Sequence, residues 1–347
     1  MSHPAFPGSP NHSDPDLGDR PRQLFAALVE LHGRTAVPVG SESLAAAAGM
    51  GLSPASIRNA LAELEDVGYL DRAHASAGRV PTARGFEYFV RTLLRPDVLS
   101  PAVLAEVDQT LLASARDVEQ LLNQASRLLS SLTHELGLAL AASLEQERLT
   151  GLDLTGLDQR RMLMVLNLGG AAVRTLVLEL ESPLERRELE EVATVLRERL
   201  VGGTLREVRD RLATDPDLAR RSAVRMVARA AAESWSHPVT TPLFSSGAMH
   251  IAEHPEFASA ARLAAVLGAV EAGSPLDRLL VGPLEGQAAV RVGLDEDRGL
   301  SACSLVSYTL PGPVHGAIGV LGPLRMDYAR ALAVVETVGA RLTELLA

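Results

Sequence analysis

The sequence predicts a multidomain α+β protein in which a small helical head with a β-hairpin precedes a larger mixed α/β body. Several short helical segments and a hairpin-like segment fall within residues 20–96. The apolar period then changes at 161–180, where two apolar runs flank a pair of glycines, a hairpin signal. Strand-like runs return near the C-terminus, so we expect a helical segment inserted into one sheet domain.

Composition excludes several classes of protein. A chain of 347 residues with 47% hydrophobic and 22% charged residues is long enough for two or three domains and is not wholly disordered. It has no membrane-length apolar run, and its N-terminus lacks the pattern of a secretory signal. The single cysteine, Cys303, cannot form an internal disulfide or a multi-cysteine zinc site, and we expect a cytoplasmic protein.

The charged residues narrow the possibilities further. All 33 basic residues are arginine, which excludes a P-loop lysine, a Schiff-base lysine and a lysine general base. The net charge is −10, yet residues 22–95 hold eight arginines and seven acidic residues. A DNA-binding head on an acidic body would show this distribution, but chance can also produce it.

The head is predicted to contain four helices after a tail, residues 1–19, that is rich in Pro, Ser and Asp and is expected to be disordered. The first helix has leucines at helical spacing, and the later ones begin at hydroxyl residues that can cap a helix. The expected limits are Pro21 to Gly33, Ser41 to Gly49, Ser53 to Gly68, and a fourth helix capped by Thr82.

The body is predicted to alternate between helical and extended segments. We expect helices over 102–148, 184–234 and 255–271, and a C-terminal helix with a buried apolar face. Extended runs are expected in 161–180, 288–296, 300–310 and 316–323. The C-terminal helix should bury Leu332, Val335, Val338 and Leu342.

Three helices and a hairpin within about 70 residues match the winged helix-turn-helix plan. With Ile57, Leu61 and Leu64 facing inward, the outer face of the third helix presents a hydroxyl, a guanidinium and an amide. Arginine can pair with guanine, asparagine with adenine, and the helix N-terminus attracts phosphate. The predicted DNA-binding residues are Ser41, Ser53, Ser56, Arg58 and Asn59, with His74, Ser76, Gly78 and Arg79 in the wing.

Two alternatives stay open on spacing alone. A helix with one outward arginine and one outward asparagine is often only a solvated helix, and helical trios with a hairpin also serve as protein-interaction modules. In the DNA-binding interpretation, Arg79 lies at the wing tip, where it reaches phosphate or the minor groove.

Six segments of the sequence resemble the HrcA family of heat-inducible transcription repressors, in the same order. The wing sequence SAGRVPT followed far downstream by GPLRMDY is the most specific part of this resemblance. The segments are PVGSESL (38–44), LSPASIRNALAELEDVGYL (52–70), HASAGRVPTARGFEYFV (74–90), LFSSGAMHIAEHPEF (243–257), GLSACSLVSY (299–308) and GPLRMDYAR (322–330).

The resemblance implies a dimeric repressor, without catalysis, that binds an inverted-repeat operator upstream of chaperone operons. Heat relieves repression in such proteins, and the chaperonin GroEL promotes the active form. The implied body is a GAF-like domain carrying an inserted dimerisation domain. The implied organisation is a tail (1–19), a winged-helix domain (20–96), a GAF-like domain (97–185 and 262–347) and an insertion (186–261).

Two departures from the family pattern concern phosphate contacts. Glu42 and Glu87 stand where members often carry a basic residue, so neither side chain is expected to bind phosphate. The affinity for DNA is then expected to be lower than in typical members, unless other arginines compensate. The candidates for compensation are Arg34, Arg72 and Arg84.

Other polar clusters favour structural roles, with no metal or cofactor expected. His250 and His254 suggest a helix cap and solvated loop, Asp295–Arg298 lacks the calcium-loop pattern, and Cys303 is expected to be an inert core thiol. Ser245 and Ser246 have no identifiable catalytic partner. Arg325 is expected to pair internally in a strand-to-helix turn that couples body to head.

Two alternatives to a heat-shock repressor stay open. One is a repressor gated by a small molecule in the GAF-like body, and the other, with no supporting motif, is an enzyme.

Overall fold

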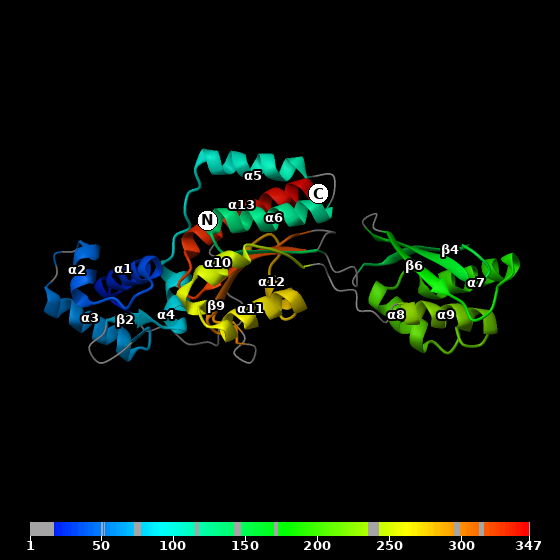
Figure 1. Ribbon diagram of the computed structural model, residues 1–347, viewed down its shortest axis with the longest axis horizontal. Helices are drawn as coiled ribbons and strands as arrows, with labels where there is room; N and C mark the ends of the chain where they lie inside the picture. The colour runs from blue at the N-terminus through cyan, green and yellow to red at the C-terminus, as the bar shows by residue number, and fades with distance from the viewer. Residues whose placement is uncertain are drawn as a thin grey trace. The chain divides into compact units, whose positions relative to one another are not determined.

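The structure, a computed structural model, divides into two compact units (Figure 1). The first comprises residues 1–141 and 242–347, and the second comprises residues 142–241. Most of the predicted tail, residues 1–16, lies outside the described part. The described residues are 17–49, 51, 53–72, 78–114, 118–141, 147–169, 173–234, 243–294, 299–311 and 316–346.

The N-terminal part of the first unit contains three helices, a hairpin and a fourth helix, as predicted. Ser53 caps the third helix by accepting from the Ser56 amide at 3.2 Å, and Thr82 caps the fourth by accepting from the Gly85 amide at 3.0 Å. The elements are α1 (Asp19–Thr35), α2 (Ser41–Ala48), α3 (Pro54–Asp66), β1 (Leu70–Arg72), β2 (Arg79–Pro81), α4 (Ala83–Tyr88) and the π-helical η1 (Phe89–Leu93).

Two helix ends in this part differ from the prediction. The N-cap of α2 is Gly40, and Ser41 is the first helical residue without a side-chain cap. Helix α1 does not stop at Gly33 but continues to Thr35, and Ala36 ends it in the left-handed region at φ 56°. Ala36, and not Gly33, therefore ends this helix.

The core of this part is the inner face of α3 against α1 and α2. Ile57, Leu61 and Leu64 are each at most 1% exposed, which confirms the predicted orientation of α3. Leu28 and Leu44 from the other two helices are fully buried in the same core. Because the inner face is buried in this core, the residues on the opposite side of α3 point outward.

The hairpin is tied to the segment that joins α1 to α2. Val39 and Arg79 exchange two backbone hydrogen bonds of 2.8 and 2.9 Å. A Cβ at Gly78 would lie 2.4 Å from the carbonyl carbon of Val39, so this approach requires a glycine. The loop end of the strand pair is therefore tied to the segment that joins the first two helices.

The rest of the first unit is a five-stranded antiparallel sheet with helices on both faces (Figure 1). Helices α6 (Val118–Thr133) and α13 (Tyr328–Leu346) cover one face, with α5 (Pro101–Ala113) packed on them. Helices α10 (Ala248–Glu253), α11 (Ala260–Ala272) and α12 (Leu276–Leu280) cover the other. The strand order is β7 (Leu243–Ser246), β3 (Leu136–Leu140), β10 (Ala317–Pro323), β9 (Cys303–Thr309), β8 (Ala288–Val292).

The second unit has its own sheet and core. An antiparallel sheet, in the order β4 (Leu149–Gly156), β5 (Arg161–Leu168), β6 (Val173–Glu179), packs one face on three helices. The helices are α7 (Arg186–Leu200), α8 (Leu205–Thr214) and α9 (Ser222–Ser234).

This architecture corrects the predicted limits of the insertion. The inserted compact unit spans 142–241 rather than 186–261. The predicted hairpin at 161–180 exists as β5 and β6, but it pairs with β4 and not with the sheet of the first unit. At the other boundary, β7 pairs with β3, which places residues after 242 in the first unit. The insertion is therefore mixed α/β, and the helix expected over 102–148 ends at Thr133 before β3.

Candidate DNA-binding surface

The outer face of α3 carries the predicted recognition residues. Ser53, Ser56, Arg58 and Asn59 are all exposed, and the two serine hydroxyls lie 3.0 Å apart. Arg58 and Asn59 make no hydrogen bond or ion pair with any residue that the structure describes. They therefore present an unpaired guanidinium and an unpaired amide on adjacent residues in the N-terminal half of a capped helix, the combination that reads base edges in a major groove.

The wing is only partly described. His74 and Ser76 lie outside the described residues, and Gly78 serves the backbone approach to Val39. Arg79 is the first residue of β2 and pairs with Arg72 at the loop end of the two strands, and its Nη2 donates to Glu65 Oε2 at 3.0 Å. With its side chain 20% exposed, Arg79 is already held by a carboxylate on α3.

Glu65 is the polar residue of the head that sequence reasoning missed. Its carboxylate accepts from Arg72 as well as from Arg79, so it joins α3 to both strands of the hairpin. Hydrogen bonding from Arg72, opposed by partial burial, lowers the pKa of the Glu65 carboxyl, with Arg79 adding to the effect. No spacing in the sequence signals this pairing, because the partners lie on different elements.

The surroundings of α2 and the hairpin show how the departures from the family pattern are accommodated. Glu42 is exposed in the first turn of α2, where a carboxylate stabilises the positive end of the helix dipole. Of the arginines considered for compensation, Arg72 pairs with Glu65, and Arg84 lies 5.4 Å from the centroid of the Tyr69 ring. Arg34 is exposed and has no partner among the described residues.

Comparisons with known proteins cover almost the whole chain. A family model for the HrcA protein C-terminal domain matches residues 119–332. The heat-inducible transcription repressor HrcA of Nitratidesulfovibrio vulgaris (strain DSM 19637 / Miyazaki F) is 34% identical, covering 95% of this chain and 96% of that protein. The chain belongs to the HrcA family. The HrcA of Chlorobium phaeobacteroides (strain BS1) is 31% identical, covering 95% and 99% of the two chains.

A crystal structure of a hypothetical protein shares the fold of this HrcA chain. Its TM-score is 0.56 at 19% sequence identity, and the match covers 95% of this chain and 99% of that one. At this level of identity the likeness concerns the fold alone. Among the described residues, no helix is long and apolar enough to cross a membrane, and no cluster of metal-ligating side chains is present.

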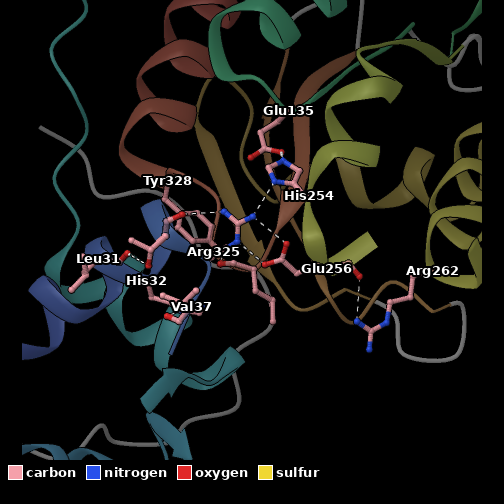
Figure 2. Close-up of polar contacts among 12 residues, drawn as sticks. Leu31, His32, Val37, Glu135, His254, Glu256, Arg262, Arg325 and Tyr328 are labelled. Atoms are coloured by element: carbon pink, nitrogen blue, oxygen red, sulfur yellow. Dashed lines mark hydrogen bonds and ion pairs between the residues drawn. The ribbon is translucent and has the colours of Figure 1, made fainter. Parts of the chain in front are cut away.

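The remaining polar residues of this HrcA chain give a mixed outcome. Burial raises the pKa of Cys303 to about 12, as expected for an inert core thiol. Arg325 pairs internally as predicted, with Glu256. The solvated loop expected at His254 is wrong, because its Nε2 lies 3.0 Å from the buried carboxylate of Glu135 (Figure 2). Asp295–Arg298 lie outside the described residues.

Proposed function

We propose that the head is a winged helix-turn-helix domain and that the chain represses class I heat-shock (chaperone) operons by binding an inverted repeat as a dimer. Arg58 and Asn59, which are exposed on α3 and have no partner in the described part of the chain, carry this proposal. Family membership supports it, because the relatives are named heat-inducible transcription repressors. The proposal places the protein in the cytoplasm, gives its body a GAF-like fold, and includes no catalytic step, metal or cofactor.

Each half-site contact follows from the chemistry of α3. The helix N-terminus with Ser53 and Ser56 binds backbone phosphate, while Arg58 reads guanine and Asn59 reads adenine. Exposed acidic side chains of α3, such as Glu63, lie further toward its C-terminus. A phosphate contact by Arg79 requires exchange of its Glu65 partner, so the proposed wing contribution is smaller than that of α3.

Dimerisation is assigned to the inserted unit, through the face of its sheet that points away from α7–α9. Strand β5 alternates buried residues with half-buried Leu163 and Val165, and on β6 the neighbouring Val173 and Val177 are 58% and 53% exposed. These four residues, with Asn167 and Thr175 among them, form a largely apolar sheet face that fits a second copy of the same chain. Linking two weak half-site contacts through a dimer multiplies their affinity.

Heat is proposed to act on the dimer geometry, with GroEL opposing the loss of the active fold. A factor that binds only the active form stabilises it by mass action. Operator occupancy should fall after heating of the repressor alone and should be preserved when GroEL is present during heating. Full occupancy after heating without GroEL rejects this part of the proposal.

The direct test of the recognition surface is Arg58→Ala in a gel shift with an inverted repeat and a scrambled duplex. Loss of a bidentate base contact costs about 1–3 kcal/mol per half-site, so repeat-specific retention should disappear while the thermal melt stays nearly unchanged. Arg186→Ala removes the same charge from a 94% exposed side chain in the inserted unit and is the control. If specific binding survives Arg58→Ala intact, the recognition helix is wrongly assigned.

A repressor gated by a small molecule is the second candidate. A cleft with a volume of 580 Å³ is lined by α1, η1 and the segment before α13, including Val29, Phe89 and Met326. This volume is within the usual range for sites that bind small molecules. A metabolite that raises the melting temperature and changes operator affinity together would favour this candidate.

A further inference from the structure

Arg325 lies in the turn between β10 and α13, where the body meets helix α1 of the head (Figure 2). Its side chain is 12% exposed and all three of its nitrogens donate hydrogen bonds. Nε donates to Glu256 Oε1 at 2.6 Å, and Nη2 donates to Glu256 Oε2 and His254 Nδ1, both at 3.2 Å. Nη1 donates to the carbonyl oxygen of Gly33 at 3.0 Å.

On the body side, the guanidinium is held by a chain of buried groups. A guanidinium only donates, so His254 Nδ1 accepts, and the Nε2–H of His254 therefore donates to Glu135 Oε2. Glu135 is 5% exposed and directly precedes β3. A Cβ at Gly322 of β10 would lie 2.5 Å from the Glu135 carboxyl carbon, so this strand makes room for the carboxylate. Arg325 is thus fixed to the central sheet.

On the head side, Gly33 lies in the last turn of α1, where carbonyl oxygens lack partners within the helix and carry the negative end of its dipole. A cation is favoured at this end of a helix. A Cβ at Gly33 would lie 3.3 Å from the Arg325 carbonyl oxygen, closer than most side-chain contacts. The glycine that seemed to stop the helix instead permits the head to approach the body.

Two further contacts lie beside this one. The Asp97 amide donates to the Ala329 carbonyl at 3.1 Å, and the rings of Phe86 and Tyr328 have centroids 6.2 Å apart. The ring contact and the single backbone hydrogen bond each restrict the relative orientation of head and body less strictly than a guanidinium does, because a guanidinium has a fixed fork geometry. Head and body also share one hydrophobic core, which holds them together without a fixed bond direction, and the guanidinium of Arg325 adds the directional contact.

We propose that Arg325 is a positioning residue for operator binding: by bridging Gly33 to Glu256 and His254, it fixes the orientation of the DNA-binding head on the body. This inference rests on the proposed function. In a dimer, the spacing between half-sites follows from the geometry of the two heads. A head held at a fixed angle selects one spacing, whereas a loosely held head binds each half-site and tolerates several spacings.

The test compares full-length wild type, Arg325→Gln and Arg330→Gln on inverted repeats whose half-site spacing changes by one base pair at a time. Arg330 is the matched control because its Nε donates to the Leu132 carbonyl at 3.2 Å, a contact within the body. Wild type and Arg330→Gln should prefer one spacing by about 10-fold or more. Arg325→Gln should lose that preference while its affinity for a single half-site stays within about twofold of wild type.

Two more variants distinguish positioning from a general loss of packing. Gly33→Ala should weaken the spacing preference by a smaller factor, because its contact displaces the Arg325 backbone by only a few tenths of an ångström. Arg325→Lys keeps the charge but not the fork, so it should restore the preference only in part. Full restoration by lysine would show that charge alone matters and would overturn the orienting role.

A measurement without DNA tests the same claim. Ser43 is exposed on α2 and Cys303 is fully buried, so a spin label at Ser43→Cys reports the distance between the two heads of a dimer. The distance distribution should be narrow in wild type and broad in Arg325→Gln. A narrow distribution and an unchanged spacing profile in Arg325→Gln overturn the inference. If wild type binds the inverted repeat no better than scrambled DNA, the proposed function is contradicted rather than the role of Arg325.

Discussion

The two sheets of the molecule are covered differently. In the first unit, every residue of β3, β9 and β10 is buried, because helices pack on both faces of the five-stranded sheet. In the second unit, β5 alternates after Arg161 between buried and half-buried residues, because the helices that the structure describes there pack on one face only. Continuous burial marks the closed three-layer core, and alternating burial marks the two-layer unit, although the β5 sequence itself is a nearly continuous apolar run.

This difference assigns separate tasks to the two units. The first unit joins its sheet to the head through a continuous core and the Arg325 network, so under the proposed function it orients the recognition helix. The second unit has a self-contained core and an apolar sheet face, so it suits self-association. Four substitutions test or sharpen this division of roles.

The largest effect is expected for Val177→Arg, which places a charge on the open sheet face of the second unit. The variant should be monomeric in light scattering, and operator affinity should fall about 100-fold or more because the second half-site contact is no longer linked. Val201→Arg is the control, since Val201 is 39% exposed at the end of α7 in the helical layer. A dimeric Val177→Arg with full operator affinity would remove this face from the interface.

Gly137→Ala should destabilise only the first unit. The new Cβ on β3 would lie 2.0 Å from the Ser126 carbonyl oxygen of α6, a backbone atom that cannot turn aside. We expect a loss of about 2 kcal/mol or more in the free energy of unfolding. In calorimetry, the transition of the first unit should shift to lower temperature while that of the second stays in place. A common shift of both would mean that the units unfold together.

Gly268→Ala should stabilise the first unit, whereas Gly137→Ala destabilises it. Gly268 lies inside α11, is exposed, and a Cβ there would meet no atom within 4 Å. Replacing a glycine inside a helix stabilises it by about 0.5–1 kcal/mol. Chemical denaturation should show a higher midpoint for the first unit, and a lower midpoint would mean that this helix needs the glycine for another contact.

The smallest effect is expected for Glu65→Gln, and it should depend on pH. Arg72 and Arg79 hold the pKa of the Glu65 carboxyl below its ordinary value of 4.5. The ionised carboxylate therefore contributes stability above pH 4.5 that is lost as pH falls through the lowered pKa. Denaturation at neutral pH should show a less stable variant, and the difference from wild type should vanish in strong acid. Glu63→Gln, at an exposed position on the same helix, is the control.

Much of the head was predictable because its signals are local. Hydroxyl caps at Ser53 and Thr82 and the spacing of Ile57, Leu61 and Leu64 locate α3 and its outer face without any tertiary information. The β5–β6 hairpin and the buried face of α13 were found for the same reason. Most predictions that depended only on neighbouring residues were confirmed, except the helix end at Gly33 and the cap at Ser41.

The missed features depend on residues far apart in the chain. Strand β3 is a five-residue apolar run directly after a helix, which periodicity cannot distinguish from more helix. The limits of the insertion depend on which sheet β5 and β7 join, and the pairing of His254 with Glu135 spans 119 positions. The internal pairing of Arg325 was predicted, but its contact with Gly33 appears only in the fold.

Binding of the full-length protein to two duplexes tests the central claim most directly. Both duplexes carry the same two half-sites at the same spacing, one as an inverted repeat and the other as a direct repeat. The account predicts binding to the inverted repeat about 100-fold tighter, because a two-fold symmetric dimer engages both of its half-sites at once. Equal binding to the two duplexes, and to a scrambled one, would contradict it.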